Sequence, residues 1–180
     1  MTPARNSLSP FSYVILVLVG DQGAAPHDLM RMNRQGEWIY WSAADSRFYS
    51  EPKRLANLGY LKARREPGKT TERTRYTLTA KGRRAVAEWL EQPSGFIRVQ
   101  NEPAARLNGA DLAADERSVV RSLQGIRPAI DEQLRWLERA DEIASTLPHR
   151  ERYLRLNHRL SRRILGAYLE WLDEVERELS

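Results

Sequence analysis

The alternation of apolar and polar residues predicts a chain made mostly of helices, with one short β-hairpin in its first half. Residues 10–19 are apolar on nearly every side, with Ser9 as the N-cap and Gly20 as the stop. A helix of this kind must be covered on most sides, so we expect it to contact a second element or a second subunit. A second helix is predicted from Pro26 to Gly36.

A third helix is predicted to end at Gly59, just before the hairpin. Phe48, Leu55 and Leu58 recur on one face at helical spacing, and Gly59 supplies the C-terminal stop. The other faces carry the types of side chain that reach phosphates and base edges in DNA. These residues are Ser46, Arg47, Tyr49, Ser50 and Lys53.

The N-terminus and the middle of this helix give two further expectations. Ser42 can cap the N-terminus, with Asp45 three residues later as its capping-box partner. Pro52 removes a backbone donor and is expected to kink the helix. After the helix, residues 60–66 and 73–78 are predicted to be the two strands of the hairpin, so the region has the order of a recognition helix and a β-wing.

A fourth helix is predicted from Thr79 to about Gln92, followed by the clearest boundary in the chain, Pro93-Ser94-Gly95. The buried face of this helix is expected to consist of Ala85, Val86, Trp89 and Leu90. We therefore expect two domains, residues 1–92 and 93–180. The stretch that follows holds either a short helix near Pro103 or a linker.

Two amphipathic segments organise the second half. The first begins near residue 115, and Pro128 either kinks one long helix or starts a second. The second, residues 149–179, has a heptad seam of Leu154, His158, Ser161, Leu165, Tyr168, Leu172, Val175 and Leu179. Such a seam favours an antiparallel helical hairpin that dimerises, and the alternative is packing of the two helices within a monomer.

The net charge of +5 is unevenly distributed along the 180 residues. Residues 53–84 contain eleven Lys or Arg and two Glu, a net charge of +9, whereas residues 93–180 contain 14 basic and 15 acidic residues. A basic patch on a helix and a hairpin indicates a polyanionic partner, and the alternative is a solvated charged face.

The composition also argues against several classes of protein. The chain has no cysteine, and its longest apolar run, seven residues from Tyr13 to Val19, is far too short to span a membrane. The first nine residues lack the organisation of a signal peptide, so we expect a cytoplasmic protein. The three histidines have no metal-ligand spacing and no catalytic motif is present, so we expect no enzyme activity, metal or cofactor.

Several of these stretches together resemble the PadR family of transcriptional regulators. They are residues 8–16, 26–29, 48–55, 58–61 and 75–82. The resemblance implies a mainly α-helical fold with a small β-hairpin wing: a winged helix-turn-helix N-terminal domain plus a C-terminal antiparallel helical dimerisation domain. It further implies a homodimer that binds a near-palindromic operator in double-stranded DNA, typically as a repressor.

The resemblance also assigns roles to particular residues. Tyr49 and Lys53 would contact the DNA backbone, and Ser46 and Arg47 would approach base edges. The wing would contact phosphate or the minor groove through Lys69, Arg73 and Arg75. The residues expected at the dimer interface are Phe11, Val14, Leu154, Leu165, Tyr168, Leu172 and Val175.

Some members of the family release DNA when they bind phenolic or polyaromatic compounds, so a small aromatic effector is an expected partner. Candidate walls for its site are Trp89, Trp136, Tyr168 and Trp171, and the alternative for each is core packing. The competing function is a winged-helix protein-interaction module that does not bind an operator. The basic patch argues against this alternative.

Overall fold

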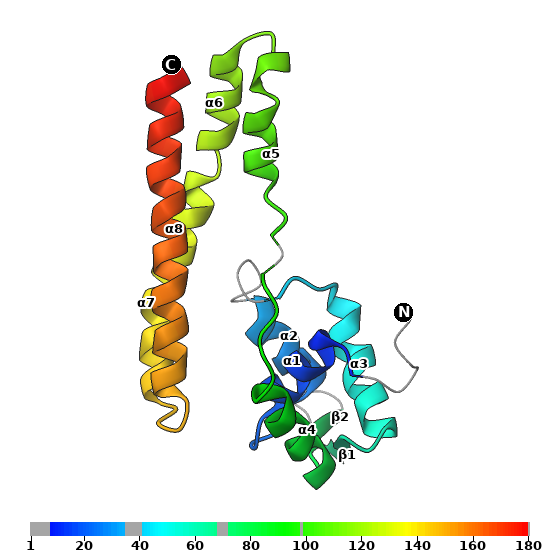
Figure 1. The fold of residues 1–180 in the computed structure, drawn as a ribbon. Helices are drawn as coiled ribbons and strands as arrows, with labels where there is room; N and C mark the ends of the chain where they lie inside the picture. The colour runs from blue at the N-terminus through cyan, green and yellow to red at the C-terminus, as the bar shows by residue number, and fades with distance from the viewer. Residues whose placement is uncertain (1–7, 35–40, 68–71, 98, 180) are drawn as a thin grey trace. The chain divides into compact units, whose positions relative to one another are not determined.

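The computed structural model describes residues 8–34, 41–67, 72–97 and 99–179 (Figure 1). The chain divides into two compact units, Met1–Phe96 and Ile97–Ser180. The first unit contains helices α1 to α4 and the hairpin β1–β2, and the second contains helices α5 to α8 with one turn of 3-10 helix, η1. The expected fold class, mainly α-helical with a small β-hairpin, is confirmed.

Helix α1 (Pro10–Val19) begins as the sequence predicts. The Ser9 and Ser12 side chains each accept a hydrogen bond from the other residue's backbone N–H, which completes a capping box. Gly20 ends the helix at a φ of 53°. Phe11, which the sequence predicts at a dimer interface, is 1% exposed and lies in the core of the first unit. Val14 is half-buried.

Helix α2 (Pro26–Arg34) is followed by helix α3 (Asp45–Asn57). The prediction that Ser42 caps α3 is wrong, because the helix begins at Asp45 behind Ala44 and has no side-chain cap. The carboxylate of Asp45 instead pairs with Arg34 at the end of α2. The predicted stop of α2 at Gly36 lies outside the described residues.

Pro52 lies within α3, which is assigned as one helix from Asp45 to Asn57. Pro52 is buried together with Phe48 and Leu55, so its ring contributes to the apolar face of the helix. Gly59 ends the helix as predicted, at a φ of 77° that glycine adopts without strain.

The hairpin consists of β1 (Leu61–Glu66) and β2 (Arg73–Leu78), paired antiparallel from Leu61–Leu78 to Glu66–Arg73. Tyr76 also exchanges two backbone hydrogen bonds of 2.9 Å with Ala24 in the turn between α1 and α2, so the root of the wing is joined to that turn. Ten buried side chains form the core of the unit: Phe11, Ile15, Leu16, Val19, Ala24, Leu29, Phe48, Leu55, Leu61 and Tyr76.

Helix α4 (Ala80–Leu90) starts at the predicted cap, where Thr79 Oγ1 accepts from the N–H of Gly82. Its expected buried face is wrong at Leu90, which is 68% exposed, whereas the other three residues of that face are half-buried. Helical periodicity places these residues on one side but does not determine how far the covering layer extends.

The second unit contains α5 (Glu102–Asn108), η1 (Ala110–Leu112), α6 (Glu116–Gln124), α7 (Arg127–Ser145) and α8 (Glu151–Leu179). Of the two expectations for Pro128, the second is correct, because α6 ends before Gly125 and Pro128 lies in the first turn of α7. Proline is favoured there, where its missing N–H has no helical partner. The short helix expected near Pro103 is also present.

The heptad seam of α8 faces inward within the chain. His158, Ser161, Leu165, Leu172 and Val175 are buried, and α8 packs on α7 and α6. Leu165, Leu172 and Val175 are therefore core residues of the second unit and not an open dimer surface, while Leu154 and Tyr168 are half-buried. A second chain would have to use other faces of this helix.

We predict that Gly82→Ala destabilises the protein. A Cβ atom at this position would lie 2.2 Å from the carbonyl oxygen of Tyr60, so the backbone would have to move. Overpacking of this kind costs about 1–3 kcal/mol, which thermal unfolding followed by circular dichroism would measure. Gly95→Ala is the control, because nothing lies within 4 Å of its new Cβ. Equal melting temperatures for the two variants would contradict the prediction.

Candidate nucleic-acid interface

One face of α3 carries the residues predicted to contact DNA, and all five of them are exposed. They are Ser46, Arg47, Tyr49, Ser50 and Lys53. Phe48, Pro52 and Leu55 are buried on the other side, so the apolar face fixes which side chains point outward. Tyr49 is 49% exposed, so part of its ring is open to solvent on this face.

The N-terminal part of α3 is held against α1 by aromatic contacts. The ring of Phe48 meets Phe11 edge to face, with centroids 5.3 Å apart, and Trp41 lies 6.1 Å from Phe11. The guanidinium of Arg47 lies 4.2 Å from the centre of the Phe11 ring, a cation–π contact. The ring therefore holds the guanidinium of Arg47 near α1, while the residue as a whole stays exposed.

A hydrogen-bonded network that was not predicted from the sequence joins the middle of α3 to the N-terminus of α1. Ser12, which is fully buried, donates through Oγ to Oε1 of Glu51 at 2.7 Å. Arg54 donates to both carboxylate oxygens of Glu51, at 2.7 and 2.9 Å, and to Ser12 Oγ at 3.0 Å. Since Ser12 also belongs to the capping box of α1, one network fixes the start of α1 and the orientation of α3.

Opposing effects act on the pKa of Glu51, and their balance lowers it. Burial acts to raise the pKa, but hydrogen bonds from Arg54 and Ser12 and the positive charges of Arg54 and Arg47 outweigh burial. The carboxylate therefore stays ionised at neutral pH. The same interaction raises the pKa of Arg54.

The wing arginines predicted to contact DNA are directed mainly at the protein itself. Arg75 donates to the carbonyl oxygens of Gln22 and Gly23, at 2.8 and 3.1 Å, and is half-buried. Arg73 is exposed but forms a 2.8 Å ion pair with Glu66, its cross-strand neighbour. Lys69 lies outside the described residues.

Two cations of β1 that were not among the predicted DNA contacts point to solvent. Lys62 and Arg64 are exposed, and within the described part of the chain neither has an ion-pair partner. The sequence could have indicated that these two side chains share a face, because residues 62 and 64 alternate with Ala63 along a strand. The wing therefore offers positive charge through β1, while Arg73 and Arg75 of β2 have protein partners.

The four candidate effector-site aromatics are divided between the two units. Trp89 stacks on Tyr13 in the first unit, with ring centroids 4.9 Å apart. In the second unit Trp136 meets His158 edge to face, while Tyr168 meets Trp171 and accepts a 2.9 Å hydrogen bond from Asn101. Two cavities of about 280 and 260 Å³ lie between α5 and α6 and are lined by neither pair.

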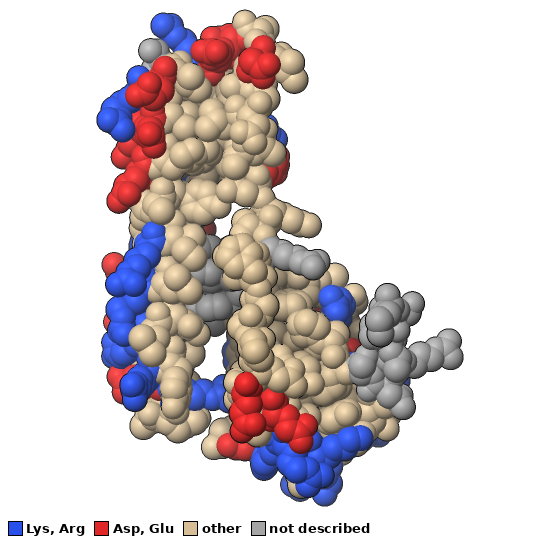
Figure 2. Space-filling view, viewed as in Figure 1, with Lys and Arg blue, Asp and Glu red and all other residues tan. Residues whose placement is uncertain are grey.

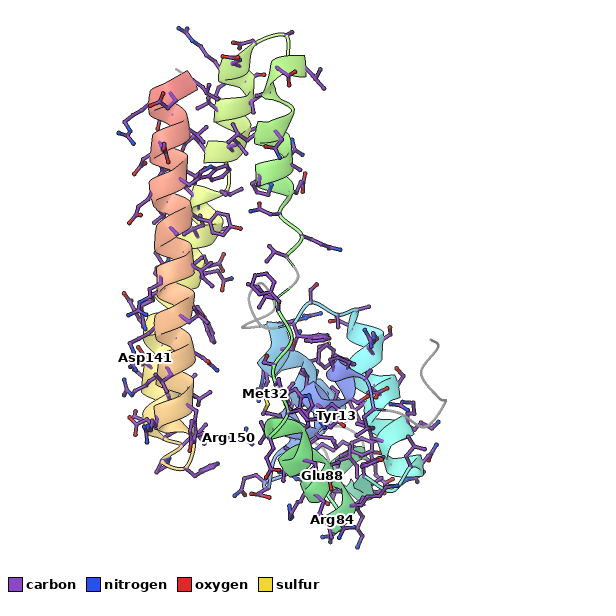
Figure 3. All side chains as sticks on the ribbon, viewed as in Figure 1. Tyr13, Met32, Arg84, Glu88, Asp141 and Arg150 are labelled. Carbon is purple, nitrogen blue, oxygen red and sulfur yellow. The ribbon has the colours of Figure 1, made fainter. Side chains whose placement is uncertain are left out.

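A buried polar cluster links α7 and α8 in the second unit, on the hairpin where Figure 3 marks Asp141. Nδ1 of His158 lies 2.6 Å from Asp141, and Arg162 donates to the same carboxylate at 2.6 Å. Burial acts to raise the pKa of Asp141, but these two hydrogen bonds outweigh it and the pKa is lowered. The cluster accounts for His158, one polar position of the seam, as a contact that fixes the register of α8 against α7.

The described residues were also compared with what a metal site and a membrane-spanning helix require. They bring no group of three His, Cys, Asp or Glu into an arrangement that could hold a metal ion. Among them, no helix has the length and apolar character needed to cross a bilayer.

The fold is that of solved PadR-type regulators. Bacillus subtilis PadR in complex with operator DNA aligns with a TM-score of 0.79 at 19% identity, covering 97% of this chain and 99% of that one. The Vibrio cholerae virulence activator AphA aligns at 0.67 and 20% identity, covering 93% and 96%. The PadR-like regulator BC1756 from Bacillus cereus aligns at 0.66 and 13% identity, covering 98% and 97%.

A further structure of Bacillus subtilis PadR holds p-coumaric acid and aligns at a TM-score of 0.62 and 17% identity, covering 94% of this chain and 99% of that one. The sequence itself matches no protein-family model and no curated protein. At these identities the likeness establishes the fold, and the resemblance predicted from the sequence is confirmed at that level.

We predict that Glu51→Gln destabilises the first unit at neutral pH. The substitution removes the charge that Arg54 neutralises, and hydrogen bonds to charged groups contribute about 1.5–3 kcal/mol. A carboxyl group whose pKa is lowered on folding stabilises the fold above its unfolded pKa, and this contribution is lost as the pH falls through the folded value. The difference from wild type should therefore shrink below pH 4.5, the ordinary value for this group.

Urea unfolding at pH 7 and in acid measures this difference. Glu88→Gln is the matched control, because Glu88 lies on α4, is exposed and has no ion-pair partner among the described residues (Figure 3). A destabilisation that is the same at both pH values would show that the charge of Glu51 is not the cause.

Proposed function

We propose that this protein is a DNA-binding transcriptional regulator whose α3 enters the major groove. The observation that carries the proposal is the outward face of α3, where polar, aromatic and basic side chains are exposed on a helix fixed by a buried apolar face and a charged network. Lys53 and Tyr49 would contact the backbone, and Ser46 and Arg47 would reach base edges. Ser50 adds an exposed hydroxyl to the same face.

The wing would add contacts to phosphate or the minor groove. Arg73 is exposed and could contact DNA, although its ion pair with Glu66 partly neutralises its positive charge. Lys62 and Arg64 are the better candidates, because they are exposed and within the described residues have no carboxylate partner. The operator-bound Bacillus subtilis PadR, which shares this fold, supports the same general mode of binding.

We further propose that the protein acts as a homodimer on a near-palindromic operator. Each chain offers one recognition helix, and two helices related by a two-fold axis would reach half-sites about 34 Å apart. Such a dimer would repress transcription where its operator overlaps a promoter. The name of the similar Vibrio cholerae protein, a virulence activator, shows that this fold also serves activation.

The competing proposal is a winged-helix module that contacts another protein. The observation in its favour is that Arg73 and Arg75 have protein partners. Against it stand three exposed cations, Lys53 of α3 and Lys62 and Arg64 of β1, which have no ion-pair partner among the described residues. DNA binding is therefore the function that the geometry supports best.

We predict salt-sensitive binding to the DNA upstream of the protein's own gene. In a gel-shift assay with non-specific competitor DNA, the protein should slow the migration of one upstream DNA fragment. Its affinity should fall by about 10³–10⁵ between about 50 and 200 mM salt if six to ten phosphates are neutralised. Equal binding to all fragments would indicate a general DNA-binding protein. An absence of binding at low salt would shift the weight to the interaction module.

Two charge reversals serve as variant and control in the same assay. Lys53→Glu should weaken binding roughly tenfold or more, because it replaces a phosphate contact with a repulsive charge. Arg117→Glu makes the same change at an exposed position of α6 in the other unit and should have little effect. Equal losses would indicate non-specific electrostatics.

We also propose release by a small aromatic effector that binds the second unit. The support is the structure of the similar Bacillus subtilis protein with p-coumaric acid, together with Trp136, Tyr168 and Trp171 of this unit. Addition of p-coumaric acid to the protein–DNA complex should release the DNA. Trp171→Phe should raise the concentration needed, while Trp89→Phe, in the first unit, should not. If both variants release DNA at the same effector concentration as the wild type, these aromatic residues do not form the effector site.

A further inference from the structure

Glu66 is the only acid in the two strands of the wing, which the structure describes in full. It ends β1, and the register pairs it directly with Arg73 of β2. The next pair on the same face of the hairpin joins Arg64 to Arg75, and Lys62 lies on that face two residues before Arg64. This face therefore carries four basic side chains and one carboxylate.

The carboxylate belongs to a strongly basic part of the first unit. Figure 2 shows Lys and Arg gathered around α4 and the hairpin, which are labelled in Figure 1. The nearby acid Glu72 has a side chain that is 70% exposed and lies 3.6 Å from Arg65. The side chain of Glu66 is only 25% exposed, so it is packed into the wing.

Glu66 lies between the two arginines of β2. Its Oε1 is 2.8 Å from a terminal nitrogen of Arg73 and 3.6 Å from one of Arg75. This oxygen is buried and accepts no hydrogen bond of regular geometry from the described residues, so the two guanidinium groups compensate its charge. Moving both arginines away would leave a buried oxygen uncompensated, which favours the paired arrangement in the free protein.

Asp28 of α2 supports the same arrangement more weakly. Its Oδ2 lies 3.9 Å from Arg73 and accepts a 3.4 Å hydrogen bond from the N–H of Ala25, while its Oδ1 lies 3.6 Å from Arg31. Asp28 is thus shared among three groups and is farther from Arg73 than Glu66 is. Glu66 is therefore the main partner that keeps Arg73 on the protein.

The two arginines differ in how they are attached. Two backbone carbonyls of the turn between α1 and α2 also hold Arg75, so Arg75 would stay in place without Glu66. Arg73 has only the two acids as partners among the described residues, and its side chain is 47% exposed. Loss of the Glu66 charge would therefore release Arg73 towards solvent.

We infer that Glu66 limits the affinity of the wing for DNA, because it keeps Arg73 on the protein and repels phosphate. The inference rests on the proposed function and names a residue that sets its strength. Attraction to phosphate supplies essentially all of non-specific binding. A carboxylate on the basic face of the wing lowers this part and leaves the base contacts of α3 unchanged. Glu66 thus acts against binding to unrelated DNA.

Glu66→Gln tests the inference, because it removes the charge and nearly keeps the shape of the side chain. Fluorescence anisotropy follows binding of the full-length protein to a labelled duplex of unrelated sequence, between about 50 and 200 mM salt. The variant should bind at least about threefold more tightly at low salt. The slope of log K against log salt should steepen by about 1, for one further phosphate contact. Unchanged or weaker binding would overturn the inference.

Two further variants separate this role from net charge and from folding. Glu72→Gln removes the same charge from the same region at an exposed position, and an equal gain in affinity there would overturn the inference. Glu66→Asp keeps the charge and should bind unrelated DNA much as the wild type does. Urea unfolding measures the structural part, since a purely structural Glu66 would lower stability on substitution without any gain in affinity.

A double-mutant cycle identifies the released arginine. Arg73→Gln alone should change the salt slope little, because the guanidinium of Arg73 is already paired with Glu66. In the Glu66→Gln background the same change should remove the gain in affinity and slope. A gain that persists without Arg73 would overturn the inference.

Failure of the proposed function would have a different signature. If neither the wild type nor Glu66→Gln binds any duplex at low salt, the proposed function and the inference are both overturned. If the wild type binds DNA and Glu66→Gln shows no gain, only the inference is overturned.

Discussion

The docking of α3 on α1 is the constraint on which the first unit depends. Phe48 and Glu51 are three residues apart on α3, so they lie on the same side of the helix and meet α1 through an aromatic and a charged contact. The apolar contact stabilises the packing of the two helices, whereas the hydrogen bonds from Ser12 to Glu51 and from Arg54 to Ser12 fix the rotation of α3 against α1. The outward face of α3 is a consequence of this double attachment.

Much of this fold could be predicted from the sequence, because the signals for helix ends and strands lie within a few neighbouring residues. The Ser9 cap, the Gly59 stop, the strands and the Thr79 cap each depend on propensities within one turn or one hairpin. The prediction at Ser42 fails because α3 begins at Asp45, behind Ala44. Asp45 pairs with Arg34 across the gap between two helices, and spacing along α3 contains no information about that partner.

The candidate site shows the same limit. Periodicity identified the exposed residues of α3 correctly, because the buried face determines them. It could not show that Arg75 would be occupied by backbone carbonyls, or that the seam of α8 would be filled by the chain's own α7 and α6. A periodic pattern states which residues share a face, and only the three-dimensional packing states what covers that face.

The attachment of the wing has a consequence for how DNA would be discriminated. Arg75 holds the carbonyls of Gln22 and Gly23, Tyr76 pairs with Ala24, and a side chain at Gly23 would meet the Tyr76 carbonyl at 2.6 Å. The fold of the protein, and not the DNA, therefore fixes the distance between the recognition helix α3 and the root of the wing. In a bound duplex the groove width would have to match that distance, so the stiffness of base pairs that no side chain touches would enter the binding energy as indirect readout.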